Sequence, residues 1–496
     1  MSAATTVPEV ASLEQARDLI ARQFETIQRL NWQLSQLKKQ LFGPSSERQP
    51  EQNLSKEQIL LSLFPSAQPA ATQQVLVLEA QEKEPRPRRQ PAAKVLETVT
   101  ERLEPEEKVC PHCGQEKCEI GCEKSERYEY VPAKVVRHEI IRPKLACVCG
   151  KAGVSIAPLP PSVVAQGQPG PSLMAHVLLS KYVDHLPLYR QQQQFERLGV
   201  NFPKSTLGDW VMQGANWLQP LVRQMKQELL AGDYVQVDET PVNVQDPDVK
   251  GRCATGWLWV LSKPQGDVIF EFHPGRGKEY ALALLGSFKG YLQRDGYGVY
   301  GSLVRDNPGL IPVGCWSHVR RKFIDAVDEQ REQATPIITE ISKLYLVERH
   351  ARDEGLRPEQ RYQLRKQTSE PLLPGLRSIL EQVQQQVLPE SPLGKAARYC
   401  INEWPALTRY LEDGRLELDN NLTENAIRPS ALGKKNWLFI GHPEAGWRSA
   451  VIYSIVVSCQ RRGIDTWSYL RDVLARLPSM KQSELPAVLP ANWKPA

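Results

Sequence analysis

The chain has 496 residues, of which 41% are hydrophobic and 24% charged, with a formal net charge of +5. This length exceeds what one hydrophobic core usually serves, so we expect about three domains. No run approaches the roughly 18 uninterrupted apolar residues of a membrane span, and no basic-then-apolar leader opens the chain. These features argue against a membrane or secreted protein and predict a cytoplasmic one. The net charge is too small to indicate nucleic-acid binding by itself.

Residues 12–43 predict a coiled coil. Apolar residues recur every seven positions at Leu13, Ile20, Ile27, Leu34 and Leu41. The period of 3.5 favours self-association over the alternative, an amphipathic helix that docks on its own protein. Residues 44–108, rich in Gln, Glu, Pro and Ala, predict a linker.

Residues 109–160 predict a zinc-binding domain. Zinc requires four ligands in a tetrahedron, and two close pairs can supply them: Cys110 with Cys113, and Cys147 with Cys149. Residues 128–141 between the pairs predict strand structure. The second pair has one intervening residue instead of the usual two, so His112, Cys118 and Cys122 are alternative ligands. Simple burial of the thiols is the competing interpretation.

Residues 170–231 predict a helical region with four helical stretches. Pro187 can open one helix, Gly199 can close it, and Ser205 can cap the next. Two helices joined by residues 199–204 make a DNA-binding helix-turn-helix possible. Any helical hairpin has a similar pattern, so the sequence leaves DNA contact by this unit open.

Residues 232–329 predict the first part of an α/β catalytic core. Strands are expected at 233–237, 256–262 and 267–273, followed by a helix at 277–288 and a strand through Tyr291 and Leu292. This order is typical of the start of a ribonuclease-H-like domain. Residues 330–412 predict a polar helical insertion, and residues 413–480 predict the rest of the core with C-terminal helices. The expected fold class is therefore multidomain α/β.

Three carboxylates in separate segments are candidate catalytic residues. Asp238 and Asp295 are each expected at the end of a strand, so neighbouring parallel strands would bring both to one sheet edge. Glu424 lies three residues after Asn421 at a predicted helix start, where a capping box is the alternative explanation. Carboxylates brought together in this way can hold the metal pair that cuts phosphodiesters.

Other acidic residues lie near the three candidates in the sequence. They are Asp233, Glu239, Glu417 and Asp419. Residue type does not separate them from the candidates, because every carboxylate is a potential metal ligand. Expected position on a strand or helix favours Asp238, Asp295 and Glu424.

Basic residues flank two of the acidic motifs and are candidate DNA contacts. They are Arg320, Arg321, Lys322, Arg428, Lys434 and Lys435. Cations beside carboxylates suit a site that phosphate must approach. Pro429 is expected to end or kink the helix that carries Glu424. The segment from Cys315 to Phe323 could bind metal, present arginines to DNA or pack. Packing with phosphate contact is favoured, since Cys315 and His318 lack a second ligand pair.

These motifs resemble the transposases of insertion-sequence-66 elements. The matching segments are Val-Asp-Glu-Thr at Asp238, Leu-Gln-Arg-Asp-Gly-Tyr at Asp295, Cys-Trp-Ser-His-Val-Arg-Arg-Lys-Phe from Cys315, and Asp-Asn-Asn-Leu-Thr-Glu from Asp419. Lys-Tyr-Val-Asp-His-Leu-Pro-Leu-Tyr-Arg from Lys181 and Leu-Phe-Gly-Pro-Ser-Ser-Glu from Leu41 also match. The sequence departs from the family at the Cys-x-Cys pair and at Asn425, where Arg is more common.

The resemblance implies a DDE transposase in which Asp238, Asp295 and Glu424 bind two Mg²⁺ ions, with Mn²⁺ as a substitute. It implies binding to terminal inverted repeats, strand cleavage there, and joining of the 3′ ends to target DNA. Zn²⁺ would occupy the cysteine domain, the coiled coil would form a homo-oligomer, and accessory proteins of the same element could take part. The competing hypotheses are a non-catalytic DNA-binding protein and a nuclease that does not join strands.

Overall fold

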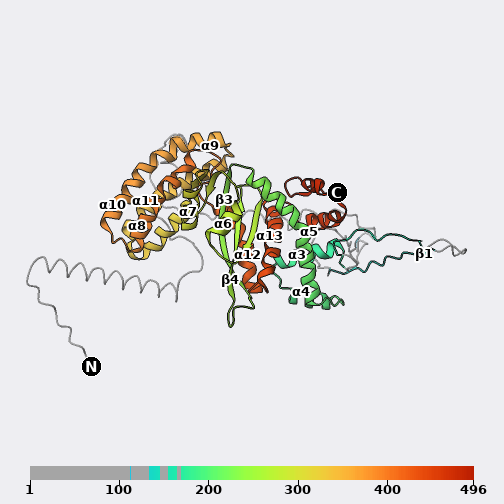
Figure 1. The fold of residues 1–496 in the computed structure, drawn as a ribbon. Helices are drawn as coiled ribbons and strands as arrows, with labels where there is room; N and C mark the ends of the chain where they lie inside the picture. Colours follow the sequence, from blue (N-terminus) through green and yellow to red (C-terminus); the bar gives the residue numbers. More distant parts are fainter. Residues whose placement is uncertain (1–111, 113–132, 146–154, 165–168, 496) are drawn as a thin grey trace, which may run out of the picture. The chain divides into compact units, whose positions relative to one another are not determined.

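The computed structural model describes residues 112, 133–145, 155–164 and 169–495 (Figure 1). The predicted coiled coil, the linker and all four proposed zinc-binding cysteines lie outside these ranges. Contacts divide the chain into two compact units, residues 1–65 with 137–496 and residues 66–136. The description below concerns the first unit. Within the described ranges, no helix is long and apolar enough to cross a membrane.

A five-stranded mixed sheet with the order β5-β4-β3-β6-β7 forms the centre of this unit. The strands are β3 (Tyr234–Val244), β4 (Ala254–Ser262), β5 (Val268–His273), β6 (Gly290–Gln293) and β7 (Leu310–Val313). The first three pair antiparallel, whereas β3, β6 and β7 run parallel. Their β-branched and aromatic residues are largely buried, as expected for a central sheet. The four strands predicted within residues 232–329 are confirmed, with shifted ends.

The end of β3 differs from the prediction. The strand does not stop at Asp238 but continues to Val244, because β4 pairs with it along Gln236–Val244. Its parallel partner β6 pairs with it only from Tyr234 to Gln236. Asp238 therefore lies within a strand, at the point where the parallel neighbour ends.

Helices cover the sheet edges and connect the strands. Helix α6 (Lys278–Leu285) leads into β6, and α7 (Gly298–Asp306) leads into β7. Helix α13 (Gly446–Arg461) lies along the edge strand β5, where the hydroxyls of Ser454 and Ser458 accept the Phe270 and Val268 backbone N–H groups at 2.8 and 2.9 Å (Figure 1). These serines satisfy backbone groups that an edge strand would otherwise leave unpaired.

Residues 170–231 form three helices, where the sequence predicted four helical stretches. They are α3 (Pro171–Tyr182), α4 (Leu188–Arg197) and α5 (Lys204–Leu230). Gly199 has a φ of +80° directly after α4, as expected for a residue that ends a helix. Ser205 lies inside α5 instead of capping it, since the helix begins one residue earlier, after Pro203. The α4–α5 pair is the predicted helix-turn-helix candidate.

Helices fill the chain between β7 and the segment that carries Glu424. They are α8 (Trp316–Asp353), α9 (Pro358–Leu364), α10 (Leu373–Gln386) and α11 (Pro392–Thr408), with short turns η2 (Arg365–Ser369), η3 (Glu370–Leu372) and η4 (Arg409–Leu411). Gln330 breaks the helical dihedrals of α8. Phe323, Ile337 and Leu380 belong to the buried core that these helices share with β7.

The remaining helices follow in the C-terminal part. They are α12 (Asn421–Trp437), η5 (Pro443–Ala445), α14 (Thr466–Arg476), η6 (Leu477–Ser479) and η7 (Gln482–Val488). Helix α12 continues through Pro429, so this proline does not end the helix, which was one of the two outcomes expected for it. A proline inside a helix removes one backbone hydrogen bond. The contacts of α12 with β3 and β4 hold this helix against the sheet.

One short strand pair lies nearer the N-terminus. β1 (Lys144–Leu145) pairs antiparallel with β2 (Ser155–Ile156), and all four residues are exposed. The strand predicted for residues 128–141 is not found in its described part, 133–141. Ile140 and Ile141 are exposed there, so these residues bury no apolar face that would hold a strand in place.

Candidate active site

A buried network of polar side chains joins β3 to its parallel neighbour β6. The Tyr234 hydroxyl donates to Gln293 Oε1 at 2.5 Å, and Gln236 Nε2 donates to the same oxygen at 2.6 Å. All three side chains are buried in the sheet. Polar groups without water are stable only when they are paired, so these bonds fix how the two strands align.

This alignment places two of the predicted carboxylates at matching positions along the neighbouring strands β3 and β6. Gln236 is the direct register partner of Gln293, 57 positions later. Asp238 and Asp295 follow these glutamines by two residues each and are separated by the same interval. Since side chains alternate along a strand, the two aspartates share the face of the glutamine pair. Asp295 itself lies just beyond the last residue of β6.

The same network docks the helix that carries Glu424. Thr423 Oγ1 donates to Gln236 Oε1 at 3.0 Å and lies 2.7 Å from Ser262 Oγ on β4. Gln293 Nε2 also donates to the Glu417 carbonyl oxygen at 2.8 Å. Glu424 is the next residue after Thr423 and lies in the first turn of α12. The network therefore brings the third carboxylate to the end of the sheet where Asp238 and Asp295 lie.

The pKa of Asp238 reflects the proximity of the other two acids. Burial raises the pKa of the Asp238 carboxyl to about 8, and the negative charges of Glu239, Glu424 and Asp295 act in the same direction. The Glu239 backbone N–H, which donates to Asp238 Oδ1 at 2.8 Å, opposes this shift. Asp295 Oδ1 accepts a similar bond from the Tyr297 backbone N–H at 3.0 Å. In the described chain, neither aspartate forms an ion pair.

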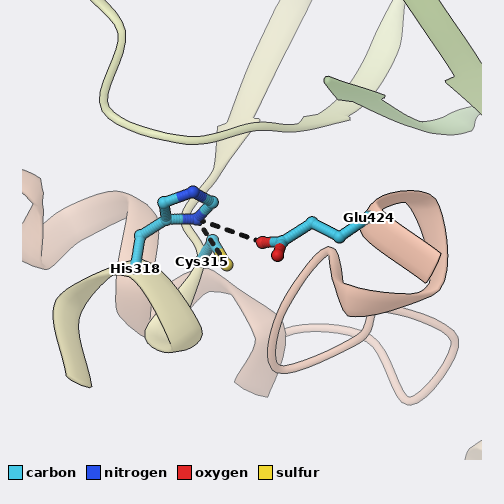
Figure 2. A group of neighbouring side chains, drawn as sticks. All are labelled: Cys315, His318 and Glu424. Atoms are coloured by element: carbon cyan, nitrogen blue, oxygen red, sulfur yellow. Dashed lines mark hydrogen bonds and ion pairs between the residues drawn. The ribbon is translucent and has the colours of Figure 1, made fainter. Parts of the chain in front are cut away.

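Glu424 contacts the start of helix α8. Its Oε2 accepts a hydrogen bond from Arg321 Nη2 at 3.2 Å, and its Oε1 lies 3.6 Å from His318 Nδ1 (Figure 2). His318 Nδ1 is also 3.2 Å from Cys315 Sγ. Burial lowers the pKa of His318, and the charge of Glu424 opposes this shift, so the imidazole is mainly neutral at pH 7.

The capping box considered for Glu424 is absent from the structure. The N-cap of α12 is Asn420, which makes no side-chain capping bond, and Asn421 is already helical. The Asn421 backbone N–H bonds instead to Asp419 Oδ1 at 3.0 Å. The carboxylate of Glu424 thus has no capping role and is available to the site.

Glu239 has a structural role next to the three acids. Arg276 Nε donates to its Oε1 at 2.6 Å, and the Tyr300 hydroxyl donates to its Oε2 at 2.6 Å. The Arg276 guanidinium is also stacked 3.7 Å from the Tyr297 ring centre. Both carboxylate oxygens are therefore engaged, which explains why a neighbour of Asp238 is a poorer metal ligand.

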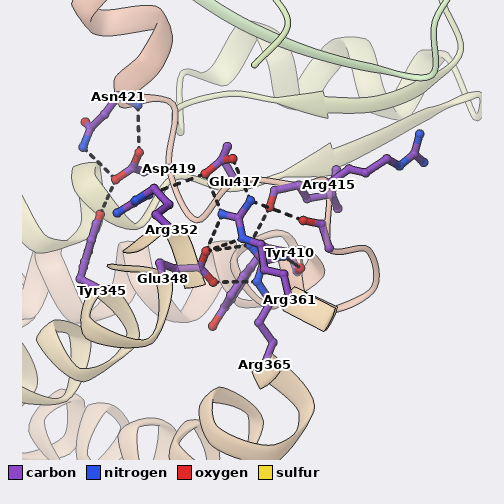
Figure 3. A network of polar contacts seen from close by, with 12 residues as sticks. Tyr345, Glu348, Arg352, Arg361, Arg365, Tyr410, Arg415, Glu417, Asp419 and Asn421 are labelled. Carbon is purple, nitrogen blue, oxygen red and sulfur yellow. Dashed lines mark hydrogen bonds and ion pairs between the residues drawn. The ribbon is translucent and has the colours of Figure 1, made fainter. Parts of the chain in front are cut away.

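The other nearby acids are also held by protein partners. Glu417 receives two bonds from Arg361, at 2.9 and 2.8 Å, and Asp419 Oδ2 accepts one from the Tyr345 hydroxyl at 2.8 Å (Figure 3). Asp233 is paired with Arg415 at 2.8 Å. Glu417, Asp419 and Asp233 are thus each engaged by other side chains of the protein.

The predicted basic residues differ in what they contact. Arg321 binds Glu424, and Lys322 lies 4.6 Å from the Tyr399 ring centre. Lys434 donates to the Pro241 carbonyl oxygen at 2.9 Å and so fastens α12 to β3. Arg428 and Lys435 are exposed on α12, and Arg320 is partly exposed on α8. Lys434 is therefore mainly a structural contact, and the exposed side chains are better placed to meet phosphate.

Two features of the site were missed in the sequence. One is the glutamine network, although its signal was present: Gln236 and Gln293 each stand two residues before a candidate aspartate, in the same Gln-x-Asp pattern. The other is the approach of Cys315 and His318 to Glu424. No local spacing predicts that contact, because more than a hundred residues separate His318 from Glu424.

Comparison with known families identifies the family of the chain. The chain matches the Transposase IS66 family over residues 166–448. It also matches the zinc-finger binding domain of transposase IS66 over 107–150, and a family described as Transposase C of IS166 homeodomain over 29–100. The chain belongs to the IS66 transposase family. The zinc-finger match covers all four predicted cysteine ligands and supports Zn²⁺ in that segment.

Similar proteins occur in Sinorhizobium fredii (strain NBRC 101917 / NGR234). Uncharacterized protein y4qI is 34% identical over 428 residues, which cover 83% of this chain and 78% of that protein. Uncharacterized protein y4jD is 34% identical over 408 residues, 79% of each chain. This IS66 family member thus shares most of its length with relatives whose names state no activity.

The glutamine network generates a stability prediction. Gln293→Met keeps most of the side-chain volume but leaves the Tyr234 hydroxyl and the Glu417 carbonyl without their buried partner. We expect the free energy of unfolding to fall by about 1–3 kcal/mol, measured by urea denaturation. The control is Gln386→Met on the exposed surface of α10. Equal stability of both variants would show that the network does not hold the strands.

Proposed function

We propose that this chain is a DDE transposase that binds the terminal inverted repeats of its element, cleaves DNA there and joins the 3′ ends to target DNA. The observation that carries the proposal is the convergence of Asp238, Asp295 and Glu424. Asp238 and Asp295 each follow, by two residues, a glutamine of the register pair that joins the parallel strands β3 and β6. Buried contacts dock the helix that carries Glu424. The family match supplies the DNA substrate class.

The sheet supports a ribonuclease-H-like catalytic domain. Three antiparallel strands are followed by two strands parallel to the first, in the order β5-β4-β3-β6-β7. This is the strand order of that fold, and Asp238 and Asp295 lie on its first strand and just after its fourth. The helices from α8 to η4 would then be an insertion between the second and third acids.

The three acids fit a Mg²⁺ pair by their donor chemistry. Carboxylate oxygens are the ligands that this hard cation prefers. In the described chain, Asp238 and Asp295 accept backbone hydrogen bonds and form no ion pair, and burial disfavours the ionised form of Asp238, which a bound cation would restore. When bound, Mg²⁺ would polarise the scissile phosphate and lower the pKa of the attacking water or 3′-hydroxyl. Two ions, or Mn²⁺ in their place, would be held by the three side chains.

The protein's own residues then orient the reaction. A backbone N–H holds one carboxylate oxygen of each of Asp238 and Asp295 and leaves the other oxygen for a cation. Arg321 binds one oxygen of Glu424 and brings a positive charge to the place where a phosphate would approach. The attacking oxygen and the leaving oxygen act in line at phosphorus, and no covalent protein intermediate is required.

DNA contacts are proposed for exposed cations around this site. Arg428 and Lys435 on α12, with Arg320 and Lys322 on α8, lie on the two helices that flank Glu424. Arg321 would turn from Glu424 toward phosphate, and Lys434 would contribute its charge from its anchored position. The α4–α5 hairpin would add sequence-specific contacts. A homo-oligomer formed through residues 12–43, with accessory proteins of the same element, would complete the assembly.

Loss of a metal ligand should abolish cleavage. We expect Asp238→Asn and Asp295→Asn to lower Mg²⁺-dependent cleavage of DNA that carries the element's ends by at least about 100-fold, since each removes a charge that holds the ions. The control is Asp248→Asn in an exposed loop. Mn²⁺ should raise the melting temperature of the wild type and the control more than that of either variant.

Unchanged cleavage in both variants would overturn the metal assignment. Cleavage without joined products would indicate a nuclease instead of a transposase. Binding of the terminal repeats with no metal-dependent cleavage in the wild type would favour a non-catalytic DNA-binding protein.

Burial of Asp238 predicts a pH-dependent stability in the metal-free protein. Because its folded pKa of about 8 exceeds the ordinary 3.8, the folded state binds the proton more tightly, and stability falls as pH rises through this window. Asp238→Asn removes this loss. In EDTA, we expect the stability difference, variant minus wild type, to grow by about 2–5 kcal/mol between pH 4 and pH 8 and then to level off. Urea denaturation at several pH values measures it, and a constant difference would contradict it.

Phosphate contacts should be visible in the salt dependence of DNA binding. We expect Arg428→Gln and Lys435→Gln each to weaken binding of the terminal repeats and to reduce the slope of log affinity against log salt by about 0.9. Lys366→Gln, which removes an exposed cation paired with Glu370, is the control. Fluorescence anisotropy over a salt series measures both quantities. Equal slopes in all four proteins would exclude these residues from the interface.

A further inference from the structure

Three potential soft-metal ligands meet beside the proposed Mg²⁺ pair. The ligand atoms of Cys315, His318 and Glu424 all lie within 4.8 Å of one another (Figure 2). His318 Nδ1 is 3.2 Å from Cys315 Sγ and 3.6 Å from Glu424 Oε1. Each comes from a rigid position: Cys315 is the N-cap of α8, His318 is in its first turn, and Glu424 is in the first turn of α12.

One of these atoms lacks a partner. Glu424 Oε1 is buried and accepts no hydrogen bond from the described protein, while Arg321 occupies Oε2. A buried carboxylate oxygen without a donor is costly, and such groups in folded proteins usually indicate a bound ion or water. The atom faces the imidazole and the thiol, so the missing partner would lie between the three side chains.

Two of the three spacings between the ligand atoms suit zinc. Zinc lies about 2.3 Å from sulfur and about 2.0–2.2 Å from nitrogen and oxygen, so ligand atoms of a tetrahedral site are roughly 3.3–3.7 Å apart. The two distances from His318 Nδ1 are within a few tenths of an ångström of this range. Thiolate and imidazole select Zn²⁺ over Mg²⁺ and leave a fourth position for water. A lone Cys-x-x-His pair was too little to predict a site, and Glu424 supplies the third ligand.

We propose that Cys315, His318 and Glu424 form a second transition-metal site, separate from the zinc finger, and that Zn²⁺ bound there withdraws Glu424 from the Mg²⁺ pair and inhibits cleavage. The binding part of the proposal stands on these three side chains alone. The inhibitory part rests on the proposed transposase function, since it requires Glu424 to be a Mg²⁺ ligand.

The alternative use of the same contacts is purely positional. Cys315 Sγ donates to Asn420 Oδ1 at 2.9 Å and accepts from the Asn420 backbone N–H at 3.5 Å, so the thiol holds the residue before α12. In that case His318 would orient Glu424 without any metal. Direct measurement of metal binding separates the two roles, because a positional role gives no metal-dependent signal.

Titration of the full-length chain with Co²⁺, after it has been supplied with a single equivalent of Zn²⁺ for the zinc finger, tests the binding part. We expect the wild type to take up one more equivalent of Co²⁺ than Cys315→Ser, with a thiolate-to-cobalt charge-transfer absorption that the variant lacks. His318→Gln and Glu424→Gln should weaken this additional site at least tenfold. Because all proteins carry the same zinc finger, the difference isolates the new site. Cys253→Ser, which removes an exposed thiol elsewhere, should behave as the wild type.

Folding of each variant is checked by its melting temperature before titration. His318 and Glu424 are only partly buried, so their variants test the proposal even where loss of the buried Cys315 thiol unfolds the chain. Identical Co²⁺ uptake and absorption in the wild type, His318→Gln and Glu424→Gln would overturn the site.

Inhibition is tested in the same proteins. We expect micromolar Zn²⁺ to suppress Mg²⁺-dependent cleavage in the wild type and in Cys253→Ser, and His318→Gln to require at least tenfold more Zn²⁺ for the same fractional loss. Co²⁺ binding without any wild-type cleavage would remove the transposase proposal and keep the site. Cleavage with no additional Co²⁺ binding would remove the second metal site and keep the transposase proposal.

Discussion

The site depends on one buried hydrogen-bond network, formed by Tyr234, Gln236 and Gln293. Its members come from the two central parallel strands, and its outer bonds reach Thr423 on α12 and the carbonyl oxygens of Glu417 and Asp419. Because no water reaches these groups, a shift in strand register or in the position of α12 would leave several of them unpaired. The network therefore fixes all three acids through a single set of constraints.

The helical segment between β7 and α12 supports this network from the outside. Arg365 is completely buried, binds Glu348 and donates to the carbonyl oxygens of Tyr410 and Leu416 (Figure 3). Arg361 joins Glu348 to Glu417. These bonds hold residues 410–417, whose Glu417 carbonyl then meets Gln293. The segment thus contributes to the site by shaping the chain that leads to Glu424, as a scaffold for the third acid.

Local patterns explain which parts could be read from the sequence. Runs of β-branched and aromatic residues predicted β3, β4 and β5. The order of elements predicted an α/β fold. Strand and helix ends were less accurate. β3 continues beyond Asp238 because β4 pairs with it there, and α12 continues through Pro429 because it is packed against the sheet. Such tertiary contacts override local propensity.

The three candidate acids were chosen by residue type, expected position and family resemblance, and the sequence predicted that parallel strands would bring Asp238 and Asp295 to one sheet edge. The contacts around the acids were not predicted. Asp238, Asp295 and Glu424 were chosen over Glu239 and Glu417 by position, and the ion pairs that engage the latter two are long-range contacts with no sequence signature. The approach of His318 to Glu424 is equally long-range. Only the repeated Gln-x-Asp pattern offered a local signal for the register that aligns the aspartates.

The central claim is that the glutamine network brings Asp238, Asp295 and Glu424 into one metal site. A crystal structure of the protein soaked with Mn²⁺, with anomalous scattering recorded at the manganese edge, tests it most directly. We expect anomalous peaks about 2.0–2.3 Å from carboxylate oxygens of Asp238 and Asp295, with Glu424 coordinating at least one of the ions. Saturating Mn²⁺ that leaves this sheet end empty, or binds only elsewhere, would contradict the account.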